Sequence, residues 1–192
     1  MTKPLITALL YAALALGANP VQAQSLSTER RAALLEMRTE DMRKLKIHES
    51  PQDAVLVTFT DPTGALHSLA DSNGKIRVVN FWATWCFPCR EEMPTLDALQ
   101  KALGGEDFEV LAIATGFNHQ EGIDSFLSQA GVTSLPVLLD PDSSLGAEFG
   151  ALGLPLTLIL NRDGQEIARL IGGAEWNSES AVSIISALIS LD

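Results

Sequence analysis

The segment VNFWATWCFPCREEMP, residues 79–94, carries the most information in this chain. It contains the only two cysteines among the 192 residues, Cys86 and Cys89, with two residues between them. Thiols at this spacing form a redox-active pair, half of a metal site or a short structural disulfide. A disulfide between residues so close in sequence removes little entropy from the unfolded chain. A zinc site needs about four ligands, and the three histidines are scattered without paired spacing: His48, His67 and His119. We therefore predict redox chemistry at the cysteine pair.

The residues around the cysteines predict a strand followed by a helix. Residues 76–82 are rich in β-branched and aromatic side chains, which favours a strand. Residues 83–85 form the predicted turn. From residue 89 to residue 103 the apolar side chains recur at helical spacing, and two glycines at 104 and 105 end the predicted helix. Pro94 is expected to kink this helix without ending it.

The two cysteines are expected to have different roles. Cys86 lies just before the predicted helix, where free N–H groups and the positive end of the helix dipole favour a thiolate. Such a position lowers the pKa of a cysteine, so Cys86 is the predicted exposed nucleophile. Cys89, one turn inside the helix, is shielded and would resolve the mixed disulfide. Phe87 and Pro88 between them should influence the redox potential, because Pro88 has no N–H to offer the thiolate.

Residues 79–94 resemble the thioredoxin superfamily, and specifically the TlpA/ResA-like disulfide reductases of bacterial envelopes. The resemblance implies an α/β, thioredoxin-like fold in which a central mixed β-sheet is flanked by helices. The residue pattern adds an N-terminal helical extension. The resemblance covers about residues 55–190, and 172–176 is most similar to the TlpA branch. The segments that carry it outside the cysteine motif are 61–64, 68–71, 153–157 and 172–176.

The resemblance also assigns residues around the cysteine pair. The family places a cis-proline loop against the disulfide, here at Leu154 and Pro155, although only about 5–6% of X-Pro bonds are cis in general. The backbone of this loop can pair with an extended substrate segment. Trp85, Phe87 and Pro88 complete the predicted active-site turn.

Two interpretations of Glu92 stay open. A carboxylate near a helix N-terminus is favourable even when it is merely solvated. In ResA-like proteins the corresponding Glu lies close to the active site, which implies a role in protonation of the cysteines or in partner recognition. Asn80, six residues before Cys86, stands where ordinary thioredoxins carry a buried Asp that shuttles a proton. Because Asn cannot titrate, this residue favours the TlpA-like branch, which often has Asn, over a general thioredoxin.

The resemblance implies a function in dithiol–disulfide exchange in the bacterial periplasm. TlpA/ResA-like proteins are reductants that supply electrons for cytochrome c maturation or for assembly of the copper site of cytochrome oxidase. The implied partners are disulfide-containing envelope proteins, namely apocytochrome c or copper-site assembly proteins. A membrane thiol transporter of the DsbD/CcdA kind would re-reduce the pair. The exchange needs no cofactor and no metal, and we expect a monomer.

Other functions use related folds or chemistry. A DsbA-like oxidase or isomerase uses the same exchange, although the sequence shows no inserted helical domain. A Sco-like copper chaperone normally has three residues between its cysteines and a distal histidine ligand, for which His119 is the candidate. The Pro-x-x-x-Thr-x-x-Cys motif of peroxiredoxins is absent, because Thr84 is two residues rather than three from Cys86.

Composition and the N-terminal residues are typical of an exported protein. The formal net charge is −11, which argues against nucleic-acid binding. Residues 1–23 have the layout of a signal peptide, with Lys3, an apolar stretch over 5–18 and a small-residue cleavage site. The apolar stretch is shorter than the roughly 20 residues that span a bilayer, and an uncleaved membrane anchor is the alternative. The rest is expected to comprise an N-terminal helical extension and linker, 24–54, and one thioredoxin-like domain, 55–192.

The remaining pattern follows the thioredoxin order of elements. Residues 27–46 predict one exposed, charged helix packed loosely on the domain, and 50–53 a linker. Asn118 and Glu121 resemble a capping box that opens a helix ending near residue 131. Ser143 or Ser144 is expected to cap a short helix. The further predicted strands and the last helix are 55–59, 108–115, 137–139, 156–160, 166–171 and 178–191.

Overall fold

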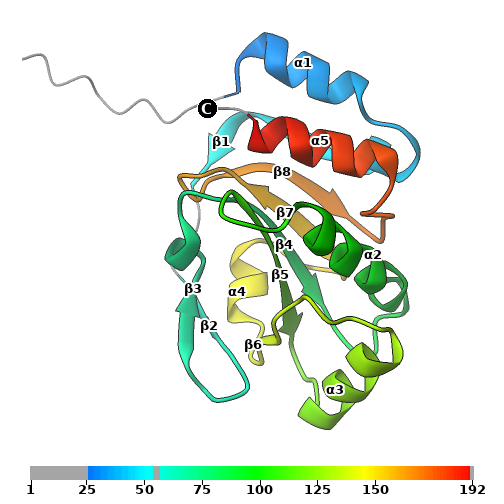
Figure 1. The fold of residues 1–192 in the computed structure, drawn as a ribbon. Helices are drawn as coiled ribbons and strands as arrows, with labels where there is room; N and C mark the ends of the chain where they lie inside the picture. The colour runs from blue at the N-terminus through cyan, green and yellow to red at the C-terminus, as the bar shows by residue number, and fades with distance from the viewer. Residues whose placement is uncertain (1–25, 54–56, 191–192) are drawn as a thin grey trace, which may run out of the picture.

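The structure is a computed structural model that describes residues 26–53 and 57–190 (Figure 1). In this part of the chain the helices are α1 (Thr28–Glu36), η1 (Glu40–Lys44), η2 (Leu69–Ser72), α2 (Phe87–Leu103), α3 (Gln120–Gln129), α4 (Ser144–Glu148) and α5 (Glu179–Ile189), of which η1 and η2 are 3-10 helices. The strands are β1 (Lys46–Gln52), β2 (Thr58–Thr60), β3 (Leu66–Ser68), β4 (Ile76–Trp82), β5 (Phe108–Thr115), β6 (Leu138–Asp140), β7 (Leu156–Leu160) and β8 (Glu166–Ile171).

Within the described residues, the strands form one mixed sheet in the order β1-β8-β7-β4-β5-β6-β2-β3. β4 lies near the centre, parallel to β5 and antiparallel to β7. Every residue of β4 is buried, as expected for a strand covered on both faces. β4 ends four residues before Cys86, so the centre of the sheet fixes the position of the cysteine turn.

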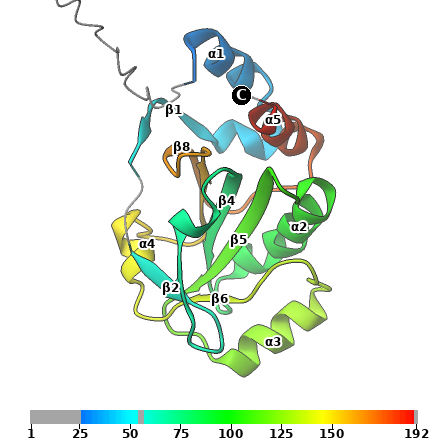
Figure 2. The same ribbon diagram turned by 60° about the vertical axis from the view of Figure 1, so that its left-hand side comes forward.

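Alternate side chains of β4 enter two hydrophobic clusters on opposite faces of the sheet. Val78 and Trp82 belong to the cluster that includes residues of α1, η1, α2, α3 and α5. Val79 and Phe81 belong to the cluster that includes residues of η2 and α4. Figure 2 shows α4 and α2 on opposite sides of the sheet. Asn80 therefore shares the face of β4 that α2 covers.

The N-terminal extension differs from the single, loosely packed helix that the sequence predicted. α1 is followed by the separate turn η1, because polar groups tie the bend between them to α5. The Ser180 hydroxyl donates to the Met37 carbonyl at 2.7 Å and accepts from the Thr39 amide at 3.1 Å. The extension is part of the core, since three of its apolar side chains are at most 3% exposed: Leu34, Met42 and Leu45.

The predicted linker at 50–53 is wrong for most of its length. β1 continues to Gln52 and pairs antiparallel with β8, with Ile47 opposite Ala168. A strand was predicted at 55–59, and the structure has β2 from Thr58 onwards in this segment. Residues 54–56 lie outside the described residues. The predicted boundary between extension and domain, after residue 54, stays a prediction.

The cap predicted for the short helix α4 is also different. Ser143 precedes the helix with a φ of 61° and makes no side-chain cap bond, since a capping side chain normally belongs to a residue with extended backbone. The Asp140 carboxylate at the end of β6 replaces it. Its two oxygens accept from the amides of Leu145 at 3.1 Å and Gly146 at 2.9 Å.

The other predicted strands and the last helix are present within two or three residues of their expected limits, which confirms the thioredoxin-like fold. The predicted signal peptide or anchor, residues 1–23, lies outside the described residues. Among the residues that are described, no helix combines the length and apolar character needed to cross a membrane.

Candidate active site

The cysteine pair lies where β4 passes into α2. Cys86 and Cys89 form a disulfide, with 5.3 Å between their Cα atoms. Cys86 is the N-cap residue of α2, and its Sγ accepts from the Cys89 amide at 3.3 Å. The helix thus begins two residues earlier than predicted and continues past Pro94. In this oxidised state Cys86 is 5% exposed and Cys89 fully buried, so Cys86 is the more accessible sulfur but is not exposed as predicted.

Exposed apolar side chains are adjacent to the cysteines in the chain. Trp85 is 67% exposed and Phe87 70% exposed, and Pro88 is exposed as well. The bond between Leu154 and Pro155 is cis, as the resemblance predicted. Leu154 is half-buried and packs against both hydrophobic clusters, one of which contains the two cysteines. The position of this loop against the disulfide stays a prediction.

Asn118 supports the turn before the cysteines rather than capping α3. Its Oδ1 accepts from the Thr84 amide at 2.8 Å and from the Thr84 hydroxyl at 3.0 Å. Its Nδ2 donates to the carbonyls of Thr115 and Gly116, both at 3.1 Å. The predicted capping box is wrong, because α3 starts after His119 without a side-chain cap bond. Asn118 instead joins the ends of β4 and β5.

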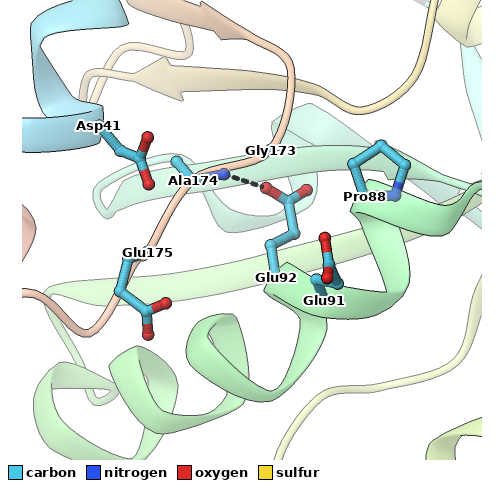
Figure 3. A pocket seen from close by; sticks show the side chains of 7 residues that line it. All are labelled: Asp41, Pro88, Glu91, Glu92, Gly173, Ala174 and Glu175. Atoms are coloured by element: carbon cyan, nitrogen blue, oxygen red, sulfur yellow. Dashed lines mark hydrogen bonds between the residues drawn. The ribbon is translucent and has the colours of Figure 1, made fainter.

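Glu92 is not a solvated carboxylate, since it is only 2% exposed. Its Oε1 accepts from Asn80 Nδ2 at 2.8 Å. Its Oε2 accepts from the Ala174 amide at 3.1 Å (Figure 3). The same oxygen accepts from the Trp176 indole at 3.3 Å. Burial raises the pKa of the Glu92 carboxyl from 4.5 to about 7, although these hydrogen bonds oppose the shift. The group can therefore gain or lose a proton near neutral pH.

Asn80 connects Glu92 to the sheet. It is fully buried, and its Nδ2 also donates to the Thr157 hydroxyl at 2.9 Å. Its Oδ1 is among the buried side-chain atoms of the described residues that have no hydrogen-bond partner. Asn80 cannot carry a proton itself, but it donates to Glu92, a carboxyl whose pKa is raised to about 7.

A cavity of about 400 Å³ adjoins Glu92 and the start of α2 (Figure 3). Four carboxylate side chains contribute to its wall, which makes it acidic. The lining residues come from η1, α2 and the loop after β8: Asp41, Pro88, Glu91, Glu92, Gly173, Ala174 and Glu175. A second hollow lies between α2 and α3, and Phe87, Arg90 and Phe126 contribute to its wall.

Comparison with known proteins places this geometry in a family. Residues 51–167 match the sequence profile of the AhpC/TSA family. The chain belongs to the AhpC/TSA family. This AhpC/TSA chain is 32% identical over 115 residues to the thiol-disulfide oxidoreductase ResA of Geobacillus kaustophilus, an alignment that covers 60% of this chain and 64% of ResA. It is also 32% identical over 118 residues to the thiol:disulfide interchange protein HelX of Rhodobacter capsulatus, covering 58% and 62%.

These alignments span slightly less than two thirds of either relative. The fold also matches the crystal structure of a thioredoxin-family thiol:disulfide interchange protein from Chlorobium tepidum, with a TM-score of 0.59 and 23% identity over 73% of this chain and 97% of that one. The predicted resemblance to ResA-like thiol-disulfide oxidoreductases is therefore confirmed, as is the thioredoxin-like fold.

The AhpC/TSA match contains the cysteine pair but not the whole site. Ala174 and Trp176, which donate to Glu92, lie after residue 167, and Asp41 of the cavity wall lies before residue 51. The segments 153–157 and 172–176 carry the family resemblance, but the sequence did not predict that Thr157, Ala174 and Trp176 bind Asn80 or Glu92. These residues and Asp41 are more than 40 positions from Glu92, and no spacing rule links them to it. The alternation along β4 could have indicated that Asn80 faces α2.

A metal site finds no support in the described residues, which contain no group of three or more His, Cys, Asp or Glu side chains that could hold an ion. His119, the candidate ligand of the copper alternative, packs edge-on against Phe117 with 4.6 Å between ring centroids.

Proposed function

We propose that this protein is a thiol-disulfide oxidoreductase that reduces disulfides of envelope proteins through Cys86 and Cys89. The observation that carries the proposal is the position of Cys86 Sγ at the N-cap of a 17-residue helix, in contact with an amide N–H. The partial positive charge at a helix N-terminus stabilises a thiolate, which is the attacking form of a cysteine.

The reaction runs through two exchanges. The Cys86 thiolate attacks one sulfur of the partner disulfide, which forms a mixed disulfide and releases the second partner sulfur as a thiolate. The Cys89 thiolate then attacks Cys86 Sγ, which breaks the mixed disulfide and releases the first partner sulfur. The partner gains two electrons and the protein ends with the Cys86–Cys89 disulfide, the state that the structure describes.

The exposed apolar side chains suit the first of these steps. Trp85 and Phe87 can cover apolar residues around a partner's disulfide, and the backbone next to Pro155 can pair with an extended segment. The buried position of Cys89 supports its role as the resolving thiol, because it keeps this sulfur away from partners during the first exchange.

Glu92 is proposed to act on the protons of the second step. It lies three residues after Cys89 on α2 and changes its charge near pH 7. A carboxylate close to a thiol disfavours the thiolate, whereas a neutral carboxyl does not. The protonation of Glu92 is therefore expected to be coupled to that of the two thiols. A pKa measured for any one of the three groups would then depend on the charge of the other two.

The direction of electron flow follows the resemblance to TlpA/ResA-like reductants. The proposed place is the periplasm, after export by the N-terminal segment or with that segment as an anchor. The proposed partners are apocytochrome c or copper-site assembly proteins, and a DsbD/CcdA-like membrane transporter would restore the dithiol. An oxidising compartment makes such a source of electrons necessary.

Trapping tests the proposal. Cys89→Ser should accumulate mixed disulfides with envelope proteins, because Cys86 attacks and nothing resolves the product. Cys86→Ser is the matched control and should accumulate none. Equal trapping by both variants, or trapping by neither, would refute the assigned roles. Partners recovered as dithiol proteins that the parent oxidises would reverse the direction and favour a DsbA-like oxidase.

A further inference from the structure

The N-terminal extension reaches the loop that holds Glu92. Lys44, the last residue of η1, donates from Nζ to the Gly173 carbonyl at 2.6 Å. It also forms an ion pair with Asp41 Oδ1 at 2.8 Å. The pKa of Asp41 is lowered chiefly by its hydrogen bond with Lys44, and the Glu175 amide contributes in the same direction. Two side chains of η1 thus bind Gly173 and Glu175, the two residues on either side of Ala174.

The loop that Lys44 holds lies tightly against the active-site helix. A Cβ atom added at Gly173 would lie 3.3 Å from both Cβ and the carbonyl oxygen of Pro88, one of the two residues between the cysteines. The next residue, Ala174, donates its amide to Glu92 Oε2 at 3.1 Å. Lys44 is therefore at one end of a short series of contacts, and the other end is the carboxyl of Glu92, three residues after Cys89 on α2.

We infer that Lys44 is a positioning residue for the proposed disulfide exchange: it holds the Gly173–Ala174 loop against Pro88 and Glu92 and thereby sets the pH at which the exchange operates. This inference rests on the proposed function and adds a control by the N-terminal extension. Lys44 lies outside residues 51–167, the part of the chain that matches the AhpC/TSA profile.

Among the described residues, Lys44 is the one cation whose charge acts on Glu92. The other charged side chains that line the cavity with Glu92 are carboxylates: Asp41 from η1, Glu91 from α2 and Glu175 from the loop after β8 (Figure 3). β4 and β7 present the uncharged Asn80 and Thr157. Removing Lys44 would leave Glu92 among carboxylates and would loosen the Ala174 amide that stabilises its charged form. Both changes favour the protonated form.

The Trp176 indole provides a direct readout, because its N–H donates to Glu92 Oε2. In the oxidised protein, the nuclear magnetic resonance signal of this N–H should move with pH around a midpoint of about 7. Lys44→Met should raise the midpoint, and Lys44→Arg should restore it towards the parent value. Lys46→Met is the matched control, since Lys46 is exposed and makes no side-chain hydrogen bond or ion pair within the described residues.

The rate at which each reduced protein reacts with glutathione disulfide, measured against pH, completes the test. The rate profile of Lys44→Met should shift to lower pH as the Trp176 midpoint rises, because a Glu92 carboxyl that stays neutral does not disfavour the thiolate. Lys46→Met should follow the parent. An unchanged midpoint in Lys44→Met, an equal shift in Lys46→Met, or a shifted midpoint with an unchanged rate profile would overturn the inference. A parent that reacts at no pH would instead refute the proposed function, and the role of Lys44 in it would fall too.

Discussion

Replacing Glu92 with Gln should remove a pH-dependent loss of stability. Gln has nearly the same size and keeps an oxygen that can accept from the Ala174 amide and the Trp176 indole. Its NH₂ group would face Asn80, whose Oδ1 has no partner among the described residues and becomes available if that amide rotates. The substitution therefore deletes the charge while most of the hydrogen-bond network can persist.

The magnitude follows from the shift in the Glu92 pKa from 4.5 to about 7. Between these values the unfolded chain has lost the proton that the folded protein still holds, so the folded state loses stability as pH rises. Each pKa unit corresponds to about 1.4 kcal/mol, so the shift amounts to about 3 kcal/mol. The loss is absent below about pH 4 and complete above about pH 8 by the same reasoning.

The measurement is urea unfolding of the oxidised proteins at a series of pH values from about 5 to about 8. The other titrating groups are the same in the parent and in Glu92→Gln. Their contributions therefore cancel when the free energy of unfolding of one protein is subtracted from that of the other. That difference should move in favour of Glu92→Gln by about 3 kcal/mol, or slightly less over this narrower window. Glu91→Gln, at the exposed neighbouring residue, should show no such trend. A difference that stays constant with pH would refute the raised pKa of Glu92.

Three further predictions concern the rest of the site and the extension. Leu34→Ala should lower the free energy of unfolding by about 2–5 kcal/mol, as for other buried leucines, because Leu34 is 3% exposed. The measurement is denaturant unfolding, and a loss below about 0.5 kcal/mol would show that the extension is loosely packed. Asn118→Ala should cost about 1–3 kcal/mol in the same assay, since it leaves the half-buried Thr84 amide without its acceptor; parent-like stability would contradict the support assigned to Asn118. In Cys89→Ser, the alkylation rate of Cys86 against pH should have its midpoint below the ordinary value of about 8.5, and a midpoint at or above that value would refute its role as nucleophile.

The centre of the fold could be predicted because its signals are local. The β-branched residues of β4, the turn and the helical spacing of α2 lie within 28 consecutive residues, 76–103, and each follows from the chemistry of its own segment. The redox role of the cysteine pair was predicted from a motif of a few residues, and the cis bond before Pro155 from a short segment that resembles the family. These parts did not depend on knowing how distant segments meet.

The environment of Glu92 could not be predicted, because it depends on contacts between distant residues. Ala174 and Trp176 lie 82 and 84 positions away in sequence, and their N–H groups reach the carboxyl only once β8 has paired with β7. The preference for carboxylates near a helix N-terminus, which is a local rule, therefore allowed Glu92 to be interpreted as a solvated carboxylate. The structure removes that interpretation, since the side chain is buried and hydrogen-bonded.

The N-terminal extension was misjudged for a related reason. Its charged residues suggested an exposed helix, and its apolar residues are too few to form a clear stripe. The structure distributes them over three short elements, and burial comes from α5 and β8, which lie more than 100 residues later. The same distance concealed the contact between Lys44 and Gly173.

The redox potential of the Cys86–Cys89 pair decides between a reductant and an oxidant. Equilibration with glutathione buffers at pH 7, followed through the fluorescence of Trp82 and Trp85, would give its value. A reductant of the proposed kind should have a potential nearer to that of thioredoxin, about −270 mV, than to that of DsbA, about −120 mV. A value above about −160 mV on that scale would contradict the account and identify the protein as an oxidant.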